Sequence, residues 1–396
     1  MSFPLPPKLR RRTTDFVIDK EVLGEGSLCL VHPCVEKASG SRFALKAFDR
    51  ATLRSSKKEA DVTMEEHCLR RLNHPSVALC GRLFKTRFQV KLHASFRDEE
   101  CHYFTLDLCP GGDLWSFVRH VGCPDRLARH YLSQVLEAVQ YLRDAQIVHR
   151  DLKAENVMIG AMGNCKLIDF GSAKDLANPQ VKGAGTRNFK SSMEEYVGTP
   201  NFMAPEVVRN LASDFRSDTW SLGCLVFQVL TGLPPFYGGS LLRVYKKICA
   251  VRLELPEHWL LPEARDLIGC MLVKDPDARL GCTELQEIQA HPYFADFIPG
   301  CPLLDRPWEG AHRRSAPVLS LEEMCIRRLG RRWAQLGARA QGFAALEGVR
   351  PQVRSNLLRL AEVQELVAGK ANDGSTSSSG VEEDEGPTTA TPTTRG

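Results

Sequence analysis

The stretch HRDLKAEN occupies residues 149–156, and thirteen residues after its last position the tripeptide DFG begins at Asp169. Phosphoryl transfer from a nucleotide needs a carboxylate that orients a hydroxyl group, and oxygen ligands that hold a divalent cation on the phosphates. We expect Asp151 to accept the substrate proton and Lys153 to contact the migrating phosphoryl group. Asn156 and Asp169 carry the oxygen atoms that could hold Mg²⁺. The order and spacing of the two segments predict a catalytic site for phosphoryl transfer.

A glycine-containing segment upstream supplies the nucleotide-binding part of this site. Residues 23–27 read LGEGS, and the glycines at the second and fourth positions let a hairpin backbone lie close over phosphates. Lys46 follows at the spacing of a lysine that neutralises the α- and β-phosphates, and Glu65, on an expected helix over 62–72, is its natural ion partner. Alone, the glycine pair would more often mean an ordinary hairpin, but its spacing to Lys46 favours phosphate binding. Cys29 stands where the general pattern has a third glycine.

The composition is consistent with a large intracellular domain. The 396 residues exceed one typical domain and are 43% apolar, which is ample for a core, and two lobes that share a cleft would fit this length. A net charge of +4 gives no support to nucleic-acid binding. The fourteen cysteines contain no Cys-x-x-Cys pair and no signal peptide is apparent, so reduced thiols are expected rather than disulfides or zinc. No apolar run reaches the length of a membrane span.

The motifs together resemble those of eukaryotic protein kinases over residues 16–294. Two runs resemble those of the AGC group of kinases: DPDARLG at 275–281 and HPYF at 291–294. The chain most resembles the 3-phosphoinositide-dependent protein kinase family, through LGEGS at 23–27, DFGSAK at 169–174, GLPPF at 232–236 and RLGC at 279–282. That family also lacks the third glycine. The resemblance implies an α+β, bilobal protein kinase fold. A small β-rich N-lobe with one key helix would face a larger helical C-lobe, with ATP in the cleft.

The resemblance and the composition divide the chain into parts. These are a basic disordered arm (1–15), a protein kinase domain (16–294) made of an N-lobe (16–106), a hinge (107–113) and a C-lobe (114–294), a helical C-terminal extension (295–370) and a disordered tail (371–396). The basic arm could be an import signal or a lipid contact, although short charge runs are more often solvated. The extension has apolar residues at helical spacing among arginines, which could pack on the kinase domain or lie on a membrane. Residues 301–396 show no alternating strands that would build a pleckstrin-homology domain.

The resemblance also assigns the ATP site residue by residue. Leu106 would be the gatekeeper and Met158 the floor beneath adenine. Backbone groups of Asp107 and Cys109 would bond the adenine edge, and Asp113 would lie near the ribose. Singly, each apolar residue would be read as ordinary core. The expected nucleotide-binding residues are Leu23, Gly24, Glu25, Gly26, Ser27, Val31, Ala44, Lys46, Leu106, Asp107, Cys109, Asp113, Glu155 and Met158.

The segment after DFG departs from the family where a regulatory phosphate is expected. Kinases with an arginine before the catalytic aspartate, here Arg150, usually need a phosphate to order this segment. The family has its phosphorylated Ser or Thr four residues before the threonine of a Gly-Thr pair, and here that position is Glu195. Glu195 could replace the phosphate opposite Arg150 and Lys174. Alternatively, Glu195 is a solvated charge and Ser191 or Ser192 takes the phosphate.

Three further positions carry expectations from related kinases. Thr199 is expected to brace the catalytic aspartate and lysine. Glu206 should pair with Arg279 inside the C-lobe, as a structural contact. Met64 stands where the family has a basic residue before the helix glutamate, which is consistent with a smaller anion to neutralise.

An insertion and its surroundings are the second departure from the family. Residues 78–89 interleave basic and apolar side chains, and could be a docking loop or the product of a retained intron. Nearby, the family binds client segments in an apolar pocket, whereas this chain has charged side chains such as Arg54, Glu59 and Arg97. Because burying an unpaired charge is costly, docking by this route would be weakened.

These expectations combine into a cytoplasmic Ser/Thr protein kinase that uses ATP and Mg²⁺ and acts on protein substrates. Family resemblance points to activation-loop Ser or Thr residues of other AGC kinases. Peripheral membrane contact is expected only through basic segments, and nucleic acid is not expected as a partner. One alternative is an AGC kinase with basic-directed substrates, although the tail lacks the hydrophobic motif of such kinases. The other is a pseudokinase scaffold, but no residue needed for the chemistry is missing.

Overall fold

The computed structural model describes residues 11–26, 28–72, 90–121, 123, 125–161, 163–181, 198–211, 213–255 and 260–295. All of them belong to the first of the two units into which the chain divides, residues 1–320. The expectations for Ser27, for the insertion at 78–89, for Ser191, Ser192 and Glu195, and for the chain after residue 295 lie outside the described residues.

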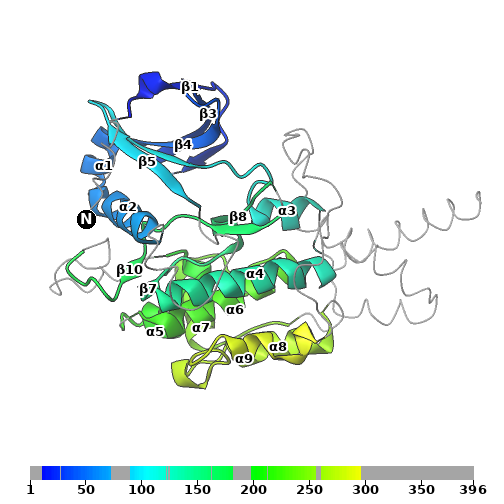
Figure 1. Ribbon diagram of the computed structural model, residues 1–396. Helices are drawn as coiled ribbons and strands as arrows, with labels where there is room; N and C mark the ends of the chain where they lie inside the picture. The colour runs from blue at the N-terminus through cyan, green and yellow to red at the C-terminus, as the bar shows by residue number, and fades with distance from the viewer. Residues whose placement is uncertain are drawn as a thin grey trace, which may run out of the picture. The chain divides into compact units, whose positions relative to one another are not determined.

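The described part has two lobes, which confirms the expected bilobal α+β fold (Figure 1). The N-lobe is an antiparallel sheet of order β1-β3-β4-β6-β5, and β2 also pairs with β3. Its strands are β1 (Phe16–Ile18), β2 (Gly24–Gly26), β3 (Cys29–Glu36), β4 (Arg42–Asp49), β5 (Leu92–Arg97) and β6 (Cys101–Asp107). One small apolar cluster of Phe16, Cys34 and Leu45 lies on this sheet, while Ala44, Phe48 and Phe104 join the main core.

The described residues of the N-lobe form two α-helices, whereas one helix was expected. Helix α2 (Glu59–Leu72) begins three residues before the expected start and buries a stripe that includes Val62, Cys68 and Leu69. The additional helix, α1 (Arg50–Ser55), is short, and its N-cap is Asp49, whose carboxylate accepts a hydrogen bond from Thr52 N. This side-chain cap stabilises a helix that is too brief to show a periodic apolar pattern.

The arm expected at 1–15 ends earlier than predicted. Thr13–Asp15 form a 3-10 turn (η1), and Arg11 pairs with Glu36. The backbone N–H of Lys37 donates to Asp15 O at 2.9 Å, which ties this turn to the end of β3. Residues 11–15 therefore belong to the N-lobe.

The C-lobe is mainly helical and is built around α6, as expected for residues 114–294. Its elements are α3 (Leu114–Val121), α4 (Asp125–Asp144), β7 (Ile147–Val148), η2 (Ala154–Asn156), β8 (Val157–Ile159), β9 (Cys165–Leu167), β10 (Lys174–Asp175), η4 (Pro200–Phe202), α5 (Pro205–Val208), α6 (Phe215–Thr231), α7 (Leu241–Cys249), α8 (Pro262–Met271), η5 (Pro276–Ala278), α9 (Gln286–Gln289) and η6 (Pro292–Phe294). Every residue of α6 from Ser217 onward is buried. The helix ends at Gly232, whose φ of 75° is readily adopted by glycine.

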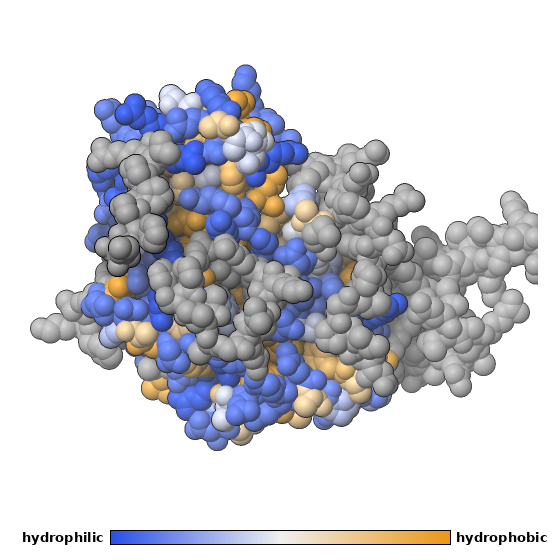
Figure 2. All heavy atoms as spheres, in the orientation of Figure 1, coloured by the Kyte–Doolittle hydropathy of each residue, from blue (hydrophilic) through white to orange (hydrophobic). Residues whose placement is uncertain are grey.

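Two short ribbons carry the functional segments between the lobes. β7 pairs with β10, and β8 pairs with β9, so the residues that precede and follow both sequence motifs are tied together. In the view of Figure 2 the described surface is mostly hydrophilic, with apolar patches on both lobes. Among the described residues, no helix combines the length and apolar character that a membrane crossing requires.

Candidate active site

Lys46 and Glu65 meet beneath the N-lobe sheet. Lys46 lies on β4 and Glu65 on α2, and Lys46 Nζ donates to the two carboxylate oxygens at 2.8 and 2.9 Å. Burial alone would lower the pKa of Lys46, but the charges of Glu65 and Asp169 outweigh it and raise the pKa. The expected ion pair is therefore present, and Lys46 is held as a cation next to the DFG segment.

Asp151 is the centre of a hydrogen-bonded cluster in the catalytic loop. Its Oδ1 accepts from Thr199 N and Thr199 Oγ1, both at 2.9 Å. Its Oδ2 accepts from Lys153 Nζ at 2.8 Å and from Asn156 Nδ2 at 3.0 Å. Lys153 Nζ also donates to Thr199 Oγ1 at 2.6 Å, so threonine, aspartate and lysine form a closed set of contacts.

The charge of Asp151 is fixed by these neighbours. Burial raises the pKa of Asp151, but the charge of Lys153 and the hydrogen bonds from Lys153 and Thr199 outweigh it, and the pKa lies below its ordinary value. The carboxylate is thus ionised at neutral pH and can accept a hydrogen bond from a hydroxyl group.

Asn156 and Asp169 offer the donor set that a hard divalent cation prefers. Asn156 Nδ2 donates to Asp151 O at 2.8 Å and to Asp151 Oδ2, so the amide oxygen is the atom that Asn156 can offer to a cation. Asp169 contributes a carboxylate and is close enough to Lys46 to raise its pKa. Magnesium binds one or two such oxygen ligands together with phosphates, so the residues fit a metal–nucleotide complex.

The catalytic loop is fastened to α6 by a residue that the sequence interpretation missed. Asp218 lies on the first turns of α6, is 2% exposed, and accepts from His149 N at 2.7 Å and Arg150 N at 2.9 Å. Burial raises the pKa of Asp218, while His149 and these two amide hydrogen bonds act in the opposite direction. The bonds hold Arg150 at a φ of 69°, which is unfavourable for a residue with a side chain.

Two further contacts that were not expected connect this loop to its surroundings. Gln228, also on α6, accepts from Ala154 N at 2.9 Å and donates to Glu155 Oε2 at 3.1 Å. Gly198 has a φ of 113°, and a Cβ atom there would lie 2.7 Å from Arg150 O. Only glycine fits this close approach between the end of the activation segment and the loop.

The apolar residues expected to line an ATP pocket lie on or next to the strands of the N-lobe and on β8. Ala44 and Leu106 are opposite each other on β4 and β6 and are buried, while Leu23 and Val31 are partly buried against the same core. Gly24, Glu25 and Gly26 form β2, which pairs with β3. Met158 lies on β8 and is bridged to Asp113.

Hydrogen bonds within the hinge leave only some of its backbone groups for adenine. The N–H of Asp107 donates to Lys91 O at 3.2 Å, so the carbonyl is the group of Asp107 that is left for adenine. The carbonyl of Cys109 accepts from Gly112 N at 3.3 Å, which leaves the Cys109 N–H. Asp113 uses its carboxylate to accept from Ser116 N and Ser116 Oγ, both at 2.7 Å, so it caps α3 whatever its role near ribose.

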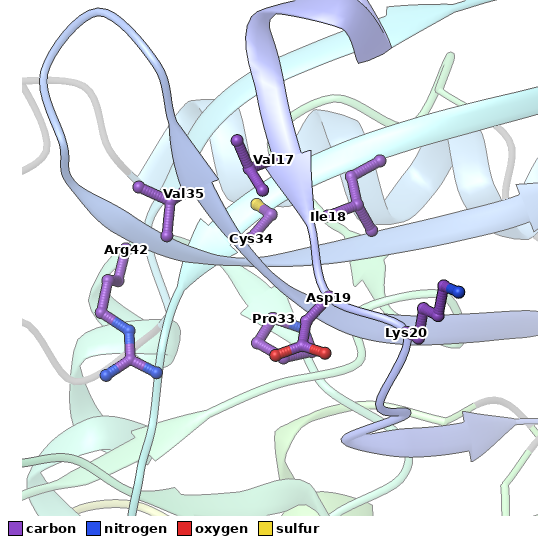
Figure 3. A pocket seen from close by; sticks show the side chains of 8 residues that line it. All are labelled: Val17, Ile18, Asp19, Lys20, Pro33, Cys34, Val35 and Arg42. Carbon is purple, nitrogen blue, oxygen red and sulfur yellow. The ribbon is translucent and has the colours of Figure 1, made fainter.

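A separate cavity lies on the N-lobe sheet, and its lining residues differ from those expected to bind ATP (Figure 3). Its volume is about 340 Å³, and it lies between the β1 and β3 segments and the start of β4. Pro33 and Val35 follow Val31 at alternate positions of β3, and Arg42 precedes Ala44 by two residues on β4. Cys34 lies between Pro33 and Val35 and also lines the cavity, so side chains from both faces of β3 take part, and none of them is assigned to the ATP pocket.

The expected regulatory cluster is described only in part. Arg150 lies in the catalytic loop, and Lys174 lies on β10, where its Nζ is 3.5 Å from Ser213 O. The structural pair of Glu206 and Arg279 is present, with Arg279 Nη1 and Nη2 donating to the two carboxylate oxygens at 2.8 and 2.6 Å.

Comparison with known proteins gives relatives that are similar in sequence to most of the chain. Residues 17–294 match the family described as "Protein kinase domain". The chain is 33% identical over 321 residues to human 3-phosphoinositide-dependent protein kinase 1, which covers 80% of this chain and 52% of the relative. It is also 33% identical over 321 residues to human putative 3-phosphoinositide-dependent protein kinase 2, with 80% and 73% covered. Serine/threonine-protein kinase PKH2 of Saccharomyces cerevisiae is 32% identical over 279 residues, with 69% and 24% covered. The chain spans about half the length of the first of these relatives.

Proposed function

This chain belongs to the protein kinase family, and we propose that it transfers the γ-phosphate of ATP to serine or threonine side chains of other proteins. The observation that carries the proposal is the cluster of Asp151, Lys153, Asn156 and Thr199, whose side chains are joined by hydrogen bonds. A pseudokinase scaffold would have no need to keep this set together with the Lys46–Glu65 pair.

Asp151 would orient the substrate hydroxyl group and accept its proton. A carboxylate accepts about four hydrogen bonds, and Asp151 already accepts four, two of them from Thr199. A substrate hydroxyl group can therefore bind only when one donor leaves. Lys153 is the donor with the longest flexible side chain, and its move toward the phosphoryl group would free the site on Asp151 and neutralise the developing charge.

Lys46 would hold the α- and β-phosphates, and Asn156 with Asp169 would hold Mg²⁺. A bound metal ion of this kind neutralises phosphate charge and aligns the transferred group. Leu23, Val31, Ala44, Leu106 and Met158 would enclose adenine, with the Asp107 carbonyl and the Cys109 N–H at its edge. In this arrangement adenine would lie at the hinge and the γ-phosphate at Asp151.

We also propose that the substrates are activation-loop residues of other AGC kinases. The support is the resemblance to 3-phosphoinositide-dependent protein kinases over 80% of the chain. The test incubates the full chain with ATP, Mg²⁺ and a catalytically inactive AGC kinase, alongside Asp151→Asn. We expect phosphate on the client activation loop, and a loss of about 10²–10⁴-fold in Asp151→Asn because the proton acceptor is removed.

The outcomes separate the parts of the proposal. Phosphorylation of generic peptides without the client product would keep the kinase and reject the client class. The absence of phosphotransfer to the client, to peptides and to the chain itself would reject the catalytic function in favour of a scaffold.

The activation segment has a separate test, because Glu195 would replace a regulatory phosphate. If it does, Glu195→Ala abolishes activity while the double change Ser191→Ala and Ser192→Ala leaves it intact. The reverse pattern would assign the regulatory phosphate to the serines.

A further inference from the structure

A buried carboxylate beside the active site has no part in the roles described above. Asp175 is the last residue of β10, six residues after Asp169, and is 2% exposed. Its main chain pairs with Ile147 of β7, the strand that leads into the catalytic loop. Asp175 is therefore fixed to the C-lobe at the root of both functional segments.

The carboxylate of Asp175 is shared between its own loop and the N-lobe. Within the loop, Oδ1 accepts from Ala177 N and Asn178 N, both at 3.0 Å, and Oδ2 accepts from Asn178 Nδ2 at 2.9 Å. Across the lobes, Oδ2 accepts from His67 Nε2 at 2.7 Å, and Arg71 Nη1 lies 2.7 Å from Oδ1. The Arg71 contact is an ion pair that lacks hydrogen-bond alignment.

The two N-lobe partners belong to the helix that carries Glu65. His67 and Arg71 are four residues apart on α2, so they share one face of the helix and both reach the same carboxylate. Glu65 lies elsewhere around the helix and points to Lys46. At the end of α2, Tyr141 Oη of α4 donates to Leu72 O at 2.7 Å, a second polar link from the C-lobe. The C-lobe thus contacts α2 along its C-terminal half.

We propose that Asp175 is a positioning residue for phosphoryl transfer: through His67 and Arg71 it holds α2 in the orientation that pairs Glu65 with Lys46. The segment that follows DFG then sets the geometry of the nucleotide site through a carboxylate that needs no phosphorylation. Met64, which stands beside Glu65 and is 1% exposed, is packed in the core and offers no charge for such a link. The link is made about one and two turns farther along the helix, at His67 and Arg71.

The charge of Asp175 is maintained by the contacts that the link requires. Burial raises the pKa of Asp175, but the hydrogen bonds from His67 and Asn178 and the charge of Arg71 outweigh it, so the pKa is below its ordinary value. His67 can donate from Nε2 in its neutral form, so this contact does not need a protonated ring. If α2 moved away from the C-lobe, the buried carboxylate would keep the neutral donors of its own loop but lose the cation Arg71 and the hydrogen bond from His67, which opposes this movement.

Neighbouring arginines on α2 give a matched control. Arg70 pairs with Glu66 on the same helix, with its Nη2 2.8 Å from Oε1, so this ion pair does not cross between the lobes. Arg71→Gln and Arg70→Gln remove the same charge from adjacent positions of one helix. Only Arg71→Gln removes a contact with Asp175.

The test is a double-mutant cycle of Arg71→Gln and Asp175→Asn, with Arg70→Gln in place of Arg71→Gln as the control cycle. The measurements are kcat and the KM for ATP with a Ser/Thr peptide, and amide hydrogen exchange over residues 59–72. We expect Arg71→Gln and Asp175→Asn each to lower kcat about tenfold. In the double variant kcat should fall little further than in the worse single variant, because both changes break the same link. In Arg70→Gln, kcat should stay within about twofold of the original chain. Exchange in α2 should accelerate in the Asp175 and Arg71 variants while exchange in α6 does not.

Several results would overturn the proposal. These are an unchanged kcat in Asp175→Asn, losses that multiply in the double variant, equal losses in Arg70→Gln, or faster exchange throughout the domain, which would mark a merely structural residue. The kinetic measurements rest on the proposed function, but the exchange measurement does not. If the chain lacks kinase activity and exchange in α2 still accelerates selectively, the link stands and the proposed function fails.

Discussion

Helices α2 and α6 both hold catalytic segments in place, but they do so by different means. Helix α6 is buried from Ser217 to Thr231, and its Asp218 and Gln228 bond the catalytic loop from within the core. Helix α2 buries only one stripe of side chains in the common core, and Asp175 and Tyr141 bind it from the C-lobe through polar contacts. Helix α6 cannot move without unpacking the C-lobe.

This difference separates a fixed half of the site from an adjustable half. Moving α6 would expose apolar surface over its whole length, and the cost of exposing one large apolar side chain is about 1.5–3 kcal/mol. Moving α2 would break a few ion pairs and hydrogen bonds, which solvent or other protein groups can replace in part, and would unpack a shorter run of buried side chains than the run of α6. We expect damage at α6 to appear as lost stability, and damage at α2 as lost activity in a folded protein.

The largest effect is expected from Asp218→Asn in α6. The amide presents an NH₂ group where the carboxylate accepted from His149 N or Arg150 N, so one buried backbone N–H loses its partner. Together with the loss of a charge-assisted bond, this should lower the free energy of unfolding by about 3 kcal/mol. Denaturant unfolding of the full chain measures the change.

Asp144→Asn is the control for this prediction. Asp144 is exposed at the end of α4 and accepts from Gln140 Nε2 at 2.8 Å. Surface contacts of this kind contribute little, so its effect should stay within about 0.5 kcal/mol. Equal effects of the two changes would mean that Asp218 does not anchor the loop.

How much of this arrangement can be predicted from sequence depends on how far apart the partners lie. The motifs locate Asp151, Asp169 and Lys46, because each lies in a short run with a fixed chemical purpose. Asp218 had a signal, a carboxylate two residues before the largely apolar run from Trp220 to Leu230, but a lone acidic residue does not indicate its partner. No local pattern could indicate Asp175, since His67 is 108 residues away in the chain.

A smaller effect, on activity rather than stability, is expected from Glu65→Gln in α2. The uncharged amide keeps one acceptor for Lys46, and the charge of Asp169 remains nearby, so the domain should stay folded with a slightly lower melting temperature. The lysine would no longer be held in the phosphate-binding position, and kcat/KM should fall about 100-fold, which corresponds to about 2.7 kcal/mol in the barrier. Steady-state kinetics and thermal unfolding on the same sample give both values.

Glu66→Gln provides the comparison on the same helix. Glu66 is the next residue and pairs with Arg70, away from Lys46. We expect kcat/KM within about twofold of the original chain, because an intrahelical pair contributes only about 0.3–0.5 kcal/mol. If the two variants lose activity equally, the Lys46–Glu65 pair has no special role.

The smallest effect concerns pH and again should distinguish α2 from α6. His102 of β6 is 4% exposed, packs against the rings of Phe48 and Phe104, and lies 3.5 Å from Glu66 of α2. Burial and the charge of Arg97 outweigh the attraction of Glu66 and lower the pKa of His102 from 6.5 to about 4. The His102 ring is therefore neutral at neutral pH, and its contact with Glu66 is not an ion pair there. The remaining charges that face it are Arg50 and Arg70, which also disfavour protonation.

The sign of the pH dependence follows from this lowered pKa. The unfolded chain binds a proton at His102 as the pH falls through about 6.5, whereas the folded chain does so only at about pH 4. The contribution of neutral His102 to the free energy of unfolding is therefore fully present above pH 6.5 and is lost as the pH falls from about 6.5 to about 4. At pH 5 the loss should be about 1 kcal/mol after allowance for partial solvent screening. His102→Asn should remove this component, while a change at the partly exposed His32 should not. Because His102 lies next to Glu66 of α2, hydrogen exchange at pH 5 should increase in α2 before it increases in α6. Simultaneous opening of both helices would show that they form one cooperative unit, which contradicts a division of the site into a fixed and an adjustable half.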